Sequence, residues 1–261
     1  MIQLITDHSY RAVQATALRD EQAKFALKRK VIIACGIDAV DEAVRAKQQG
    51  DFLVSIGDPL KSYESFDALV LSDHEPMPQH KNIIPITGLL NEFSPEKLAG
   101  LGAGFDEFPK PRIAVLLGGK HVGGDVLQAD IDTILRGVTG VKLVSTSRRT
   151  NKDLKISADF VYDFNWDGQD GNPYLEILAA ADSVVVTADS ARMCSEVCSS
   201  GKAIYIYTPR ETHFSYKALR DSLVSGGYAR DFAEIGAGIK PTKLLAEAKR
   251  VAEIIADQVA S

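Results

Sequence analysis

The segment VVVTADSARMCSEVCSSGKAIYI, residues 184–206, contains residue types that could bind a phosphorylated ligand. An apolar run ends at a small polar turn with Asp189 and Ser190, and a helical pattern that includes Met193 and Glu196 follows. The first N–H groups and the positive dipole end of such a helix favour a pyrophosphate. Glu196 lies six residues after Ser190, where its carboxylate could accept hydrogen bonds from both hydroxyls of a ribose. Alternatively, Asp189 or Ser190 only caps the helix and Glu196 is a solvated charge.

A second polar turn follows the apolar run IAVLL and consists of Gly118, Gly119 and Lys120. Paired glycines let the backbone approach a phosphate closely, and the lysine adds positive charge. The alternative is a tight turn without a ligand. Neither GxGxxG nor the Walker pattern GxxxxGK[ST] occurs in the chain, which argues against NAD-binding and P-loop proteins.

A third polar turn follows KLVST and contains Ser147, Arg148, Arg149 and Thr150. Guanidinium groups bind oxyanions in a bidentate manner, and the neighbouring hydroxyls add donors. The alternative is a solvated turn, or arginines that pair with carboxylates near Asp163 or Asp167.

A fourth candidate is the start of a helix near Asn172 and Tyr174, with Pro173 between them. Asn172 fits the cap of this helix and Pro173 its first position. That capping role alone explains both residues. The functional alternative places the start of the helix against the flat base of a nucleotide.

Candidate catalytic groups are two histidines, His8 after the first apolar run and His74 after ALVLS. A histidine can take a proton from an acceptor hydroxyl near neutral pH. The alternative is a polar turn histidine without a catalytic duty. The five histidines lack HxxxH and HExxH spacing, so we expect neither a metal site nor a cofactor.

Apolar runs that alternate with helical patterns would position these polar turns. We expect strands at 2–5, 31–35, 52–56, 68–72 and 82–86 in a first series, and at 113–118, 142–146, 159–163, 183–187 and 203–207 in a second. We expect helices at 11–27, 38–48, 126–136, 151–157, 173–181 and 191–199. Strands that are apolar at every position are buried on both faces, as in parallel sheets covered by helices. The pattern predicts an α/β fold with two Rossmann-like lobes.

The segment FPKP, residues 108–111, separates the two series. We predict an N-terminal lobe at 1–109 and a C-terminal lobe at 110–240. The final segment, 241–261, is expected to form an amphipathic helix that crosses back to the first lobe. Its apolar stripe consists of Leu244, Ala248, Val251, Ile255 and Val259.

Charge and composition exclude several classes of partner. The net charge of −5 argues against binding to nucleic acid or to an anionic membrane surface. No apolar run approaches ~20 residues, so we expect no transmembrane segment. The start, MIQLITDHSYR, lacks the pattern of a secretory signal, and the three cysteines show no CxxC spacing. We therefore expect a cytoplasmic protein.

The run ADSVVVTADSARMCSEVCSSGKAIYIY, with IAVLLGG and STSRRT before it, resembles bacterial members of the mitochondrial-fission-ELM family. In the first lobe, SFDALVLSDHEPMPQHKNIIPITGLL agrees more loosely. The second lobe also resembles the donor lobe of GT-B glycosyltransferases, in which a strand, a Ser-containing turn and a helix with a ribose-binding Glu follow one another. The resemblance covers nearly the whole chain and is strongest from residue 112 to 207.

This resemblance implies a GT-B fold, with phosphate near Ser190 and ribose at Glu196. Bacterial members of the family are often named nucleoside-diphosphate-sugar epimerases, and plant members are linked to mitochondrial fission. The first turn, Thr6–Tyr10, departs from the Gly-rich turn that such transferases usually have, and no second Glu completes the donor-binding pair.

The leading hypothesis is an enzyme that binds a UDP-linked sugar in its second lobe and transfers the glycosyl group to an unidentified acceptor. One alternative is a nucleoside-diphosphate-sugar epimerase, and another is a non-enzymatic interaction protein that kept the fold. We expect Glu196→Gln to weaken UDP binding with little change in stability.

Overall fold

The computed structural model describes residues 2–6, 30–119, 126–163, 171–236 and 240–260. The chain divides into two compact units, Met1–Glu92 with Ala246–Ser261 and Phe93–Leu245. None of the described helices has the length and apolar character needed to cross a bilayer.

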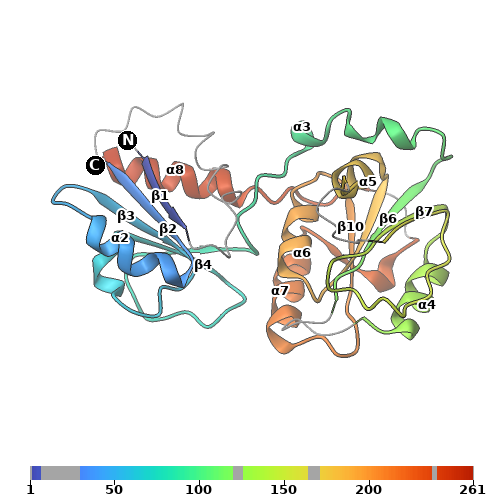
Figure 1. Cartoon of the computed structure of the whole chain (residues 1–261), viewed down its shortest axis with the longest axis horizontal. Helices are drawn as coiled ribbons and strands as arrows, with labels where there is room; N and C mark the ends of the chain where they lie inside the picture. Colours follow the sequence, from blue (N-terminus) through green and yellow to red (C-terminus); the bar gives the residue numbers. More distant parts are fainter. Residues whose placement is uncertain (1, 7–29, 120–125, 164–170, 237–239, 261) are drawn as a thin grey trace. The chain divides into compact units, whose positions relative to one another are not determined.

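The first unit is built on a sheet of five parallel strands that lie side by side in sequence order. These are β1 (Ile2–Thr6), β2 (Val31–Cys35), β3 (Phe52–Ile56), β4 (Ala68–Ser72) and β5 (Ile83–Ile86). The 3₁₀ turn η1 (Ile37–Ala39), helix α2 (Val40–Ala46) and the 3₁₀ turn η2 (Tyr63–Ser65) connect them. Apolar residues on α2 pack on one face of this sheet, and α8 (Glu247–Ala260) covers the other (Figure 1).

Helix α8 packs on the first unit through Val251, Ile255 and Val259, so the prediction that the terminal helix returns to the first lobe is confirmed. Its expected start was wrong, because the helix begins at Glu247 and Leu244 is exposed. The chain just before it still belongs to the second unit, where Leu245 N–H donates to the carbonyl of Cys198.

The second unit is built on six parallel strands in the order β11-β10-β9-β6-β7-β8. They are β6 (Arg112–Leu116), β7 (Val141–Ser145), β8 (Phe160–Tyr162), β9 (Ser183–Thr187), β10 (Ala203–Tyr207) and β11 (Arg230–Asp231). Helix α4 (Gln128–Gly137) and the 3₁₀ turn η4 (Phe232–Glu234) pack on one face. Helices α5 (Tyr174–Ala180), α6 (Ala191–Cys198) and α7 (Phe214–Ser225) pack on the other (Figure 1).

The strand order of the second sheet is that of a doubly wound Rossmann fold, because it reverses direction between β6 and β9. Two α/β units with parallel sheets, and a terminal helix that returns to the first, form the chain plan expected of the GT-B type. The predicted fold class is therefore confirmed.

The second unit begins earlier in the sequence than the predicted boundary at FPKP. The segment that contains α3 (Pro95–Leu98) and the 3₁₀ turn η3 (Leu101–Phe105) belongs to this unit. Leu98 and Phe105 are buried against its core, which places the boundary between Glu92 and Phe93 rather than at 109/110. The second boundary likewise lies between Leu245 and Ala246.

The helix expected at 151–157 does not form. Asn151 Oδ1 instead accepts a hydrogen bond from Asp153 N, and Gln128 of α4 bonds both to Lys155 N–H and to its carbonyl. These side-chain bonds satisfy the backbone in a turn, so no helical bonds are needed. The helix expected at 11–27 lies outside the described residues, and α7 had no counterpart in the sequence prediction.

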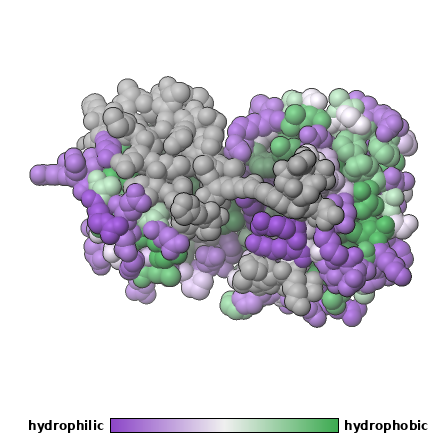
Figure 2. Space-filling model, viewed as in Figure 1, coloured by the Kyte–Doolittle hydropathy of each residue, from purple (hydrophilic) through white to green (hydrophobic). Residues whose placement is uncertain are grey.

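Hydrophilic side chains cover much of the described surface on the face in Figure 2, and hydrophobic ones form separate patches between them. The exposed large hydrophobic residues come from different segments and are Ile37, Leu60, Met77, Leu101, Val161, Leu175, Phe214 and Leu244. Single apolar residues of this kind are normal on a protein surface.

Candidate functional site

Strand order in the second sheet reverses between β6 and β9, the topology at which open α/β sheets form a crevice. The chain leaves β6 toward α4 on one face and leaves β9 toward α6 on the other face. Ligands of open α/β sheets bind beyond the carboxyl ends of the strands at such a reversal. We call this side of the second sheet, where β6, β7, β9 and β10 end, the carboxyl edge. Gly118 N–H donates to Thr187 Oγ1 at 2.8 Å, a buried bond that ties the two strand ends together.

Gly118 and Gly119 lie so close to their neighbours that no side chain fits. A Cβ atom on Gly118 would lie 2.2 Å from Asp189 Oδ2, and one on Gly119 would lie 2.1 Å from the backbone carbon of Arg149. Asp189 is itself buried. These close contacts within the protein explain why both positions are glycine, without a bound phosphate. Lys120 lies outside the described residues.

The loop after β7 is anchored to the loop after β6. Ser147 N–H donates to Thr150 Oγ1 at 2.8 Å, and the Thr150 hydroxyl donates to the carbonyl of Gly118. The hydroxyl of Ser147 also lies 3.0 Å from Thr150 Oγ1. The buried Thr150 thus fixes the path of both loops at the carboxyl edge.

Arg148 and Arg149 are exposed on this anchored loop. Neither side chain forms an ion pair within the part of the chain that the structure describes. Asp163, which could have paired with them, accepts from Lys152 Nζ at 2.8 Å and from Thr146 Oγ1 at 3.0 Å. Both guanidinium groups are therefore available to an anion at the carboxyl edge.

Ser190 caps the start of α6, since its Oγ accepts a hydrogen bond from Met193 N at 3.4 Å. Both residues are half-buried, and Met193 packs on the core beneath the helix. The first turn of α6 carries no acidic residue, so its N–H groups face no competing negative charge from the helix itself.

Glu196 is buried in a cluster with two other side chains, so the alternative of a solvated surface charge is wrong. Its Oε1 accepts from Arg192 Nε at 2.7 Å, and its Oε2 accepts from the hydroxyl of Tyr174 at 3.0 Å. Burial, together with the negative charge of Glu196, raises the pKa of Tyr174 well above its ordinary value. Tyr174 therefore stays protonated and keeps donating to the carboxylate.

The start of α5 holds the other side of this cluster. Asn172 is exposed, and its Oδ1 accepts from Tyr174 N at 3.0 Å, which is the expected capping role. The ring of Tyr174 packs edge-to-face on Phe93 with 6.2 Å between ring centroids. Arg192, whose side chain is half exposed, lies beside this carboxylate on the same helix.

The two candidate bases belong to the first unit. His8 lies outside the described residues. His74 follows β4, and its side chain is 4% exposed, with Nε2 4.0 Å from Glu75 Oε1. Burial lowers the pKa of His74, which favours a neutral imidazole near pH 7. Its Nδ1 is buried without a hydrogen-bond partner among the described residues. The described parts of the chain contain no group of residues suited to hold a metal ion.

The second unit thus brings most of the predicted binding residues to the loops and helix starts around one crevice. The sequence did not predict Arg192 or the anchoring roles of Thr150 and Thr187; Thr150 was expected only as a hydroxyl beside the arginine pair. Arg192 had a detectable signal, because a basic and an acidic residue four positions apart lie on the same face of a helix. The two threonines had none, since their roles depend on loops that are distant in sequence.

The family model described as "Mitochondrial fission ELM1" matches residues 4–259, so the chain belongs to this family. The "Mitochondrial fission protein ELM1" of Arabidopsis thaliana is 26% identical over 242 residues, which covers 77% of this chain and 57% of the relative. The "Uncharacterized protein RP120" of Rickettsia prowazekii is 33% identical over 192 residues, which covers 66% of this chain and 54% of the relative. The chain thus spans little more than half the length of these relatives.

Among solved structures, MurG of Acinetobacter baumannii aligns over 100% of this chain and 90% of its own, with a TM-score of 0.46 and 11% identity. The wall teichoic acid polymerase TagF aligns over 100% of this chain and 88% of its own, with a TM-score of 0.38 and 9% identity. The fold assignment above rests on strand order and on the returning helix, not on these two likenesses.

Proposed function

We propose that this member of the Mitochondrial fission ELM1 family binds a UDP-linked sugar at the carboxyl edge of its second sheet and transfers the sugar to an acceptor hydroxyl. The observation that carries the proposal is the reversal of strand order between β6 and β9, with the start of α6 at the resulting crevice. A helix start at such a position favours an anion through its free N–H groups.

In the proposed complex, the diphosphate lies between the start of α6 and the exposed pair Arg148 and Arg149. The Ser190 hydroxyl accepts from the backbone and can donate its own proton to a phosphate oxygen. Glu196 accepts hydrogen bonds from the ribose hydroxyls beside Arg192. The nucleobase lies near the start of α5 at Asn172.

The transfer step would form a bond between the acceptor oxygen and the anomeric carbon of the sugar, while the bond from that carbon to the diphosphate oxygen breaks. UDP leaves with the electron pair, and the positive groups at the carboxyl edge stabilise its added charge. The acceptor proton passes to a base, for which His8 and the neutral His74 are the candidates.

Calorimetric titration of the full chain with UDP tests the binding site. We expect the double variant Arg148→Gln/Arg149→Gln to bind UDP about tenfold more weakly or worse, because it loses charge-assisted hydrogen bonds. Arg136→Gln is the matched control, since Arg136 is also exposed in this unit but lies in the last turn of α4. No UDP binding by the wild type, or equal affinity in the double variant, would overturn the proposed site.

Incubation of the full chain with UDP-sugars tests the reaction, with slow donor hydrolysis as the readout because the acceptor is unidentified. Release of UDP that His74→Ala or His8→Ala reduces about 10²–10⁴-fold would support transfer and identify the base. Conversion of one UDP-sugar into its epimer would replace transfer by epimerisation. Binding without any turnover would favour the non-enzymatic alternative.

A further inference from the structure

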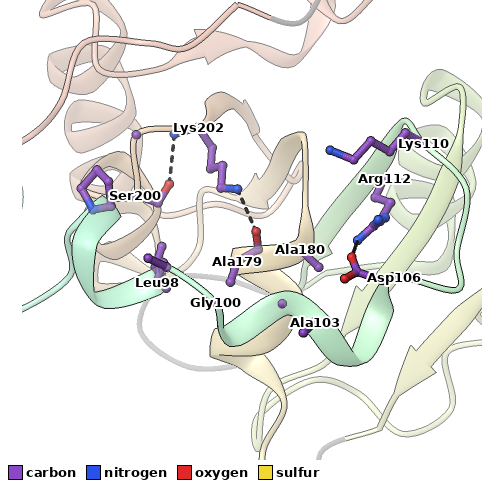
Figure 3. Close-up of a pocket in the computed structure, with 14 residues that line it drawn as sticks. Leu98, Gly100, Ala103, Asp106, Lys110, Arg112, Ala179, Ala180, Ser200 and Lys202 are labelled. Atoms are coloured by element: carbon purple, nitrogen blue, oxygen red, sulfur yellow. Dashed lines mark hydrogen bonds and ion pairs between the residues drawn. The ribbon is translucent and has the colours of Figure 1, made fainter.

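A pocket of about 490 Å³ lies in the second unit, away from the carboxyl edge. Its walls come from the α3–η3 segment, the end of α5, the turn before β10 and the first residues of β6 (Figure 3). Strands β6 and β10 begin here, so we call this side of the second sheet the amino edge. The pocket is formed within one unit and shares none of its lining residues with the crevice at the carboxyl edge.

Three cationic side chains line this amino-edge pocket, and they come from two separate segments. Lys110 and Arg112 lie at the start of β6, and Lys202 lies just before β10. In Figure 3 the amino groups of Lys110 and Lys202 point toward the middle of the pocket from opposite sides. The lining carboxylate is Asp106, and Asp182 accepts a hydrogen bond from Lys110 Nζ at 3.0 Å. These five charged groups leave a net charge of one positive unit.

Each of these cations has protein partners but retains N–H groups beyond them. Lys202 Nζ donates to the carbonyls of Ala179 and Ala181 at the end of α5, both at 2.8 Å, and an ammonium has a third donor. Arg112 is more than nine-tenths buried, and its Nε and Nη1 donate to the Phe108 carbonyl and to Asp106. A guanidinium has five N–H donors, and the described contacts use only Nε and Nη1 of Arg112. Its Nη2 group can therefore donate to a ligand.

Besides Pro95 and Leu98, the remaining wall consists of small residues, which leave the space open. A Cβ atom on Gly102 would lie 2.6 Å from Ala180 N, so this glycine lets η3 approach the end of α5 and close the pocket. Ala99 and Ala103 are exposed on the same segment. The volume is in the range of pockets that hold small organic ligands rather than a bare ion.

We propose that the amino-edge pocket is a second small-molecule site, which binds an organic anion through a terminal phosphate group. Donors approach from opposite sides of the pocket, and a tetrahedral phosphate accepts from several directions, whereas a carboxylate offers two oxygens in one plane. The organic part of the ligand would lie against the alanines and glycines. Burial lowers the pKa of Lys202, and the nearby Asp182 opposes that effect, so a bound dianion would further favour its charged form.

The test follows the backbone amides of the full chain by NMR during titration with inorganic phosphate, phenyl phosphate and acetate at constant ionic strength. We expect both phosphates to shift the amide signals of Gly100, Gly102 and Gly201 in a saturable way, and acetate to bind about tenfold more weakly. Signals of Gly118 and Gly119 report on the carboxyl edge separately, so the result does not depend on whether UDP binds there. Saturable shifts confined to Gly118 and Gly119, no saturable shifts, or equal binding of acetate would overturn the proposal.

Variants separate a ligand site from a purely structural cluster. Lys110 is exposed, so Lys110→Gln should leave the fold intact and weaken phosphate binding about threefold, the effect of one exposed charge. Ala103→Leu should narrow the pocket and weaken binding of phenyl phosphate. Lys217→Gln, an exposed lysine of α7 outside the pocket, is the control and should bind like the wild type. Wild-type affinity in both Lys110→Gln and Ala103→Leu would show that these groups serve the fold alone.

Discussion

The two units use parallel sheets in different ways. In the second sheet the strand order reverses between β6 and β9, and the helices that follow these strands cover opposite faces. In the first sheet the described strands follow one another in sequence order without a reversal. Helix α2 packs on one of its faces, and the other is covered by α8 from the far end of the chain.

The difference in strand order indicates where each unit can bind a ligand. A reversal separates two neighbouring loops and opens a crevice at the strand ends, so topology alone favours a site in the second unit. The described part of the first unit has no such crevice, and its candidate base, His74, is buried after β4. We therefore expect perturbations of the first unit to change stability or turnover but not UDP affinity, and those at the carboxyl edge to change UDP affinity as well.

The largest expected effect is on the first unit. Ile255 of α8 is buried against the first sheet, so Ile255→Ala should destabilise this unit by about 2–5 kcal/mol through lost burial and a residual cavity. Hydrogen exchange should accelerate in β2–β4 while β6, β9 and β10 stay protected. Glu253→Ala, at an exposed position of the same helix, is the control. Equal loss of protection in both sheets would contradict the independence of the two units.

The next effect is at Glu196. Glu196→Gln should weaken UDP binding by about 1.5–3 kcal/mol, because it removes a charge-assisted acceptor. The sequence suggested little change in stability, but the buried bonds to Arg192 and Tyr174 now predict a lower free energy of unfolding as well. Calorimetric titration and urea unfolding measure the two quantities, and the exposed Glu211→Gln is the control. An unchanged UDP affinity would leave Glu196 with a structural role only.

A third variant tests the close approach at the reversal. Gly118→Ala should lower the stability of the second unit by about 1–3 kcal/mol, because the added Cβ meets the carboxylate of Asp189. The matched control is Gly104→Ala in the same unit, where an added Cβ meets nothing within 4 Å. Urea unfolding followed in the second unit measures both variants. Similar urea midpoints for the two variants would show that the loop after β6 can shift to accommodate the added methyl group at little cost in stability.

The smallest effect concerns pH and the first unit. Burial lowers the pKa of His74 below its ordinary value near 6.5, so the unfolded chain binds this proton more tightly than the folded one. Stability from this group is complete above pH 6.5 and falls as the pH drops below that value, by at most about 1.4 kcal/mol for each unit of pKa difference. His74→Gln should flatten the dependence of the urea midpoint on pH between pH 7.5 and 5, because it removes this proton-binding group. An unchanged slope in His74→Gln would assign the pH dependence to other groups.

Much of the fold follows from local sequence patterns. Runs such as VIIAC, FLVSI, ALVLS, SVVVT and AIYIY form strands at the predicted positions, because apolar, largely β-branched segments of this length are stable only when buried in a sheet. The cap at Ser190 and the start of α6 were also predictable, since a hydroxyl that accepts from the first turn is a local feature. The segment 151–157 shows the limit of such patterns, because bonds from the distant Gln128 decide its path.

The site depended on tertiary structure in a way that local patterns do not encode. Local sequence was enough to predict that polar residues follow the strands and that Glu196 lies within the helix after Ser190. The burial of Glu196 beside Tyr174, 22 residues away, follows instead from the packing of α5 on α6. Strand order likewise decided which loops share a crevice, and packing between α5 and η3 decided that Lys110 and Lys202 line one pocket. The physical reason is that burial and charge pairing depend on which distant segments pack together, whereas caps and strand periodicity depend on a few adjacent residues.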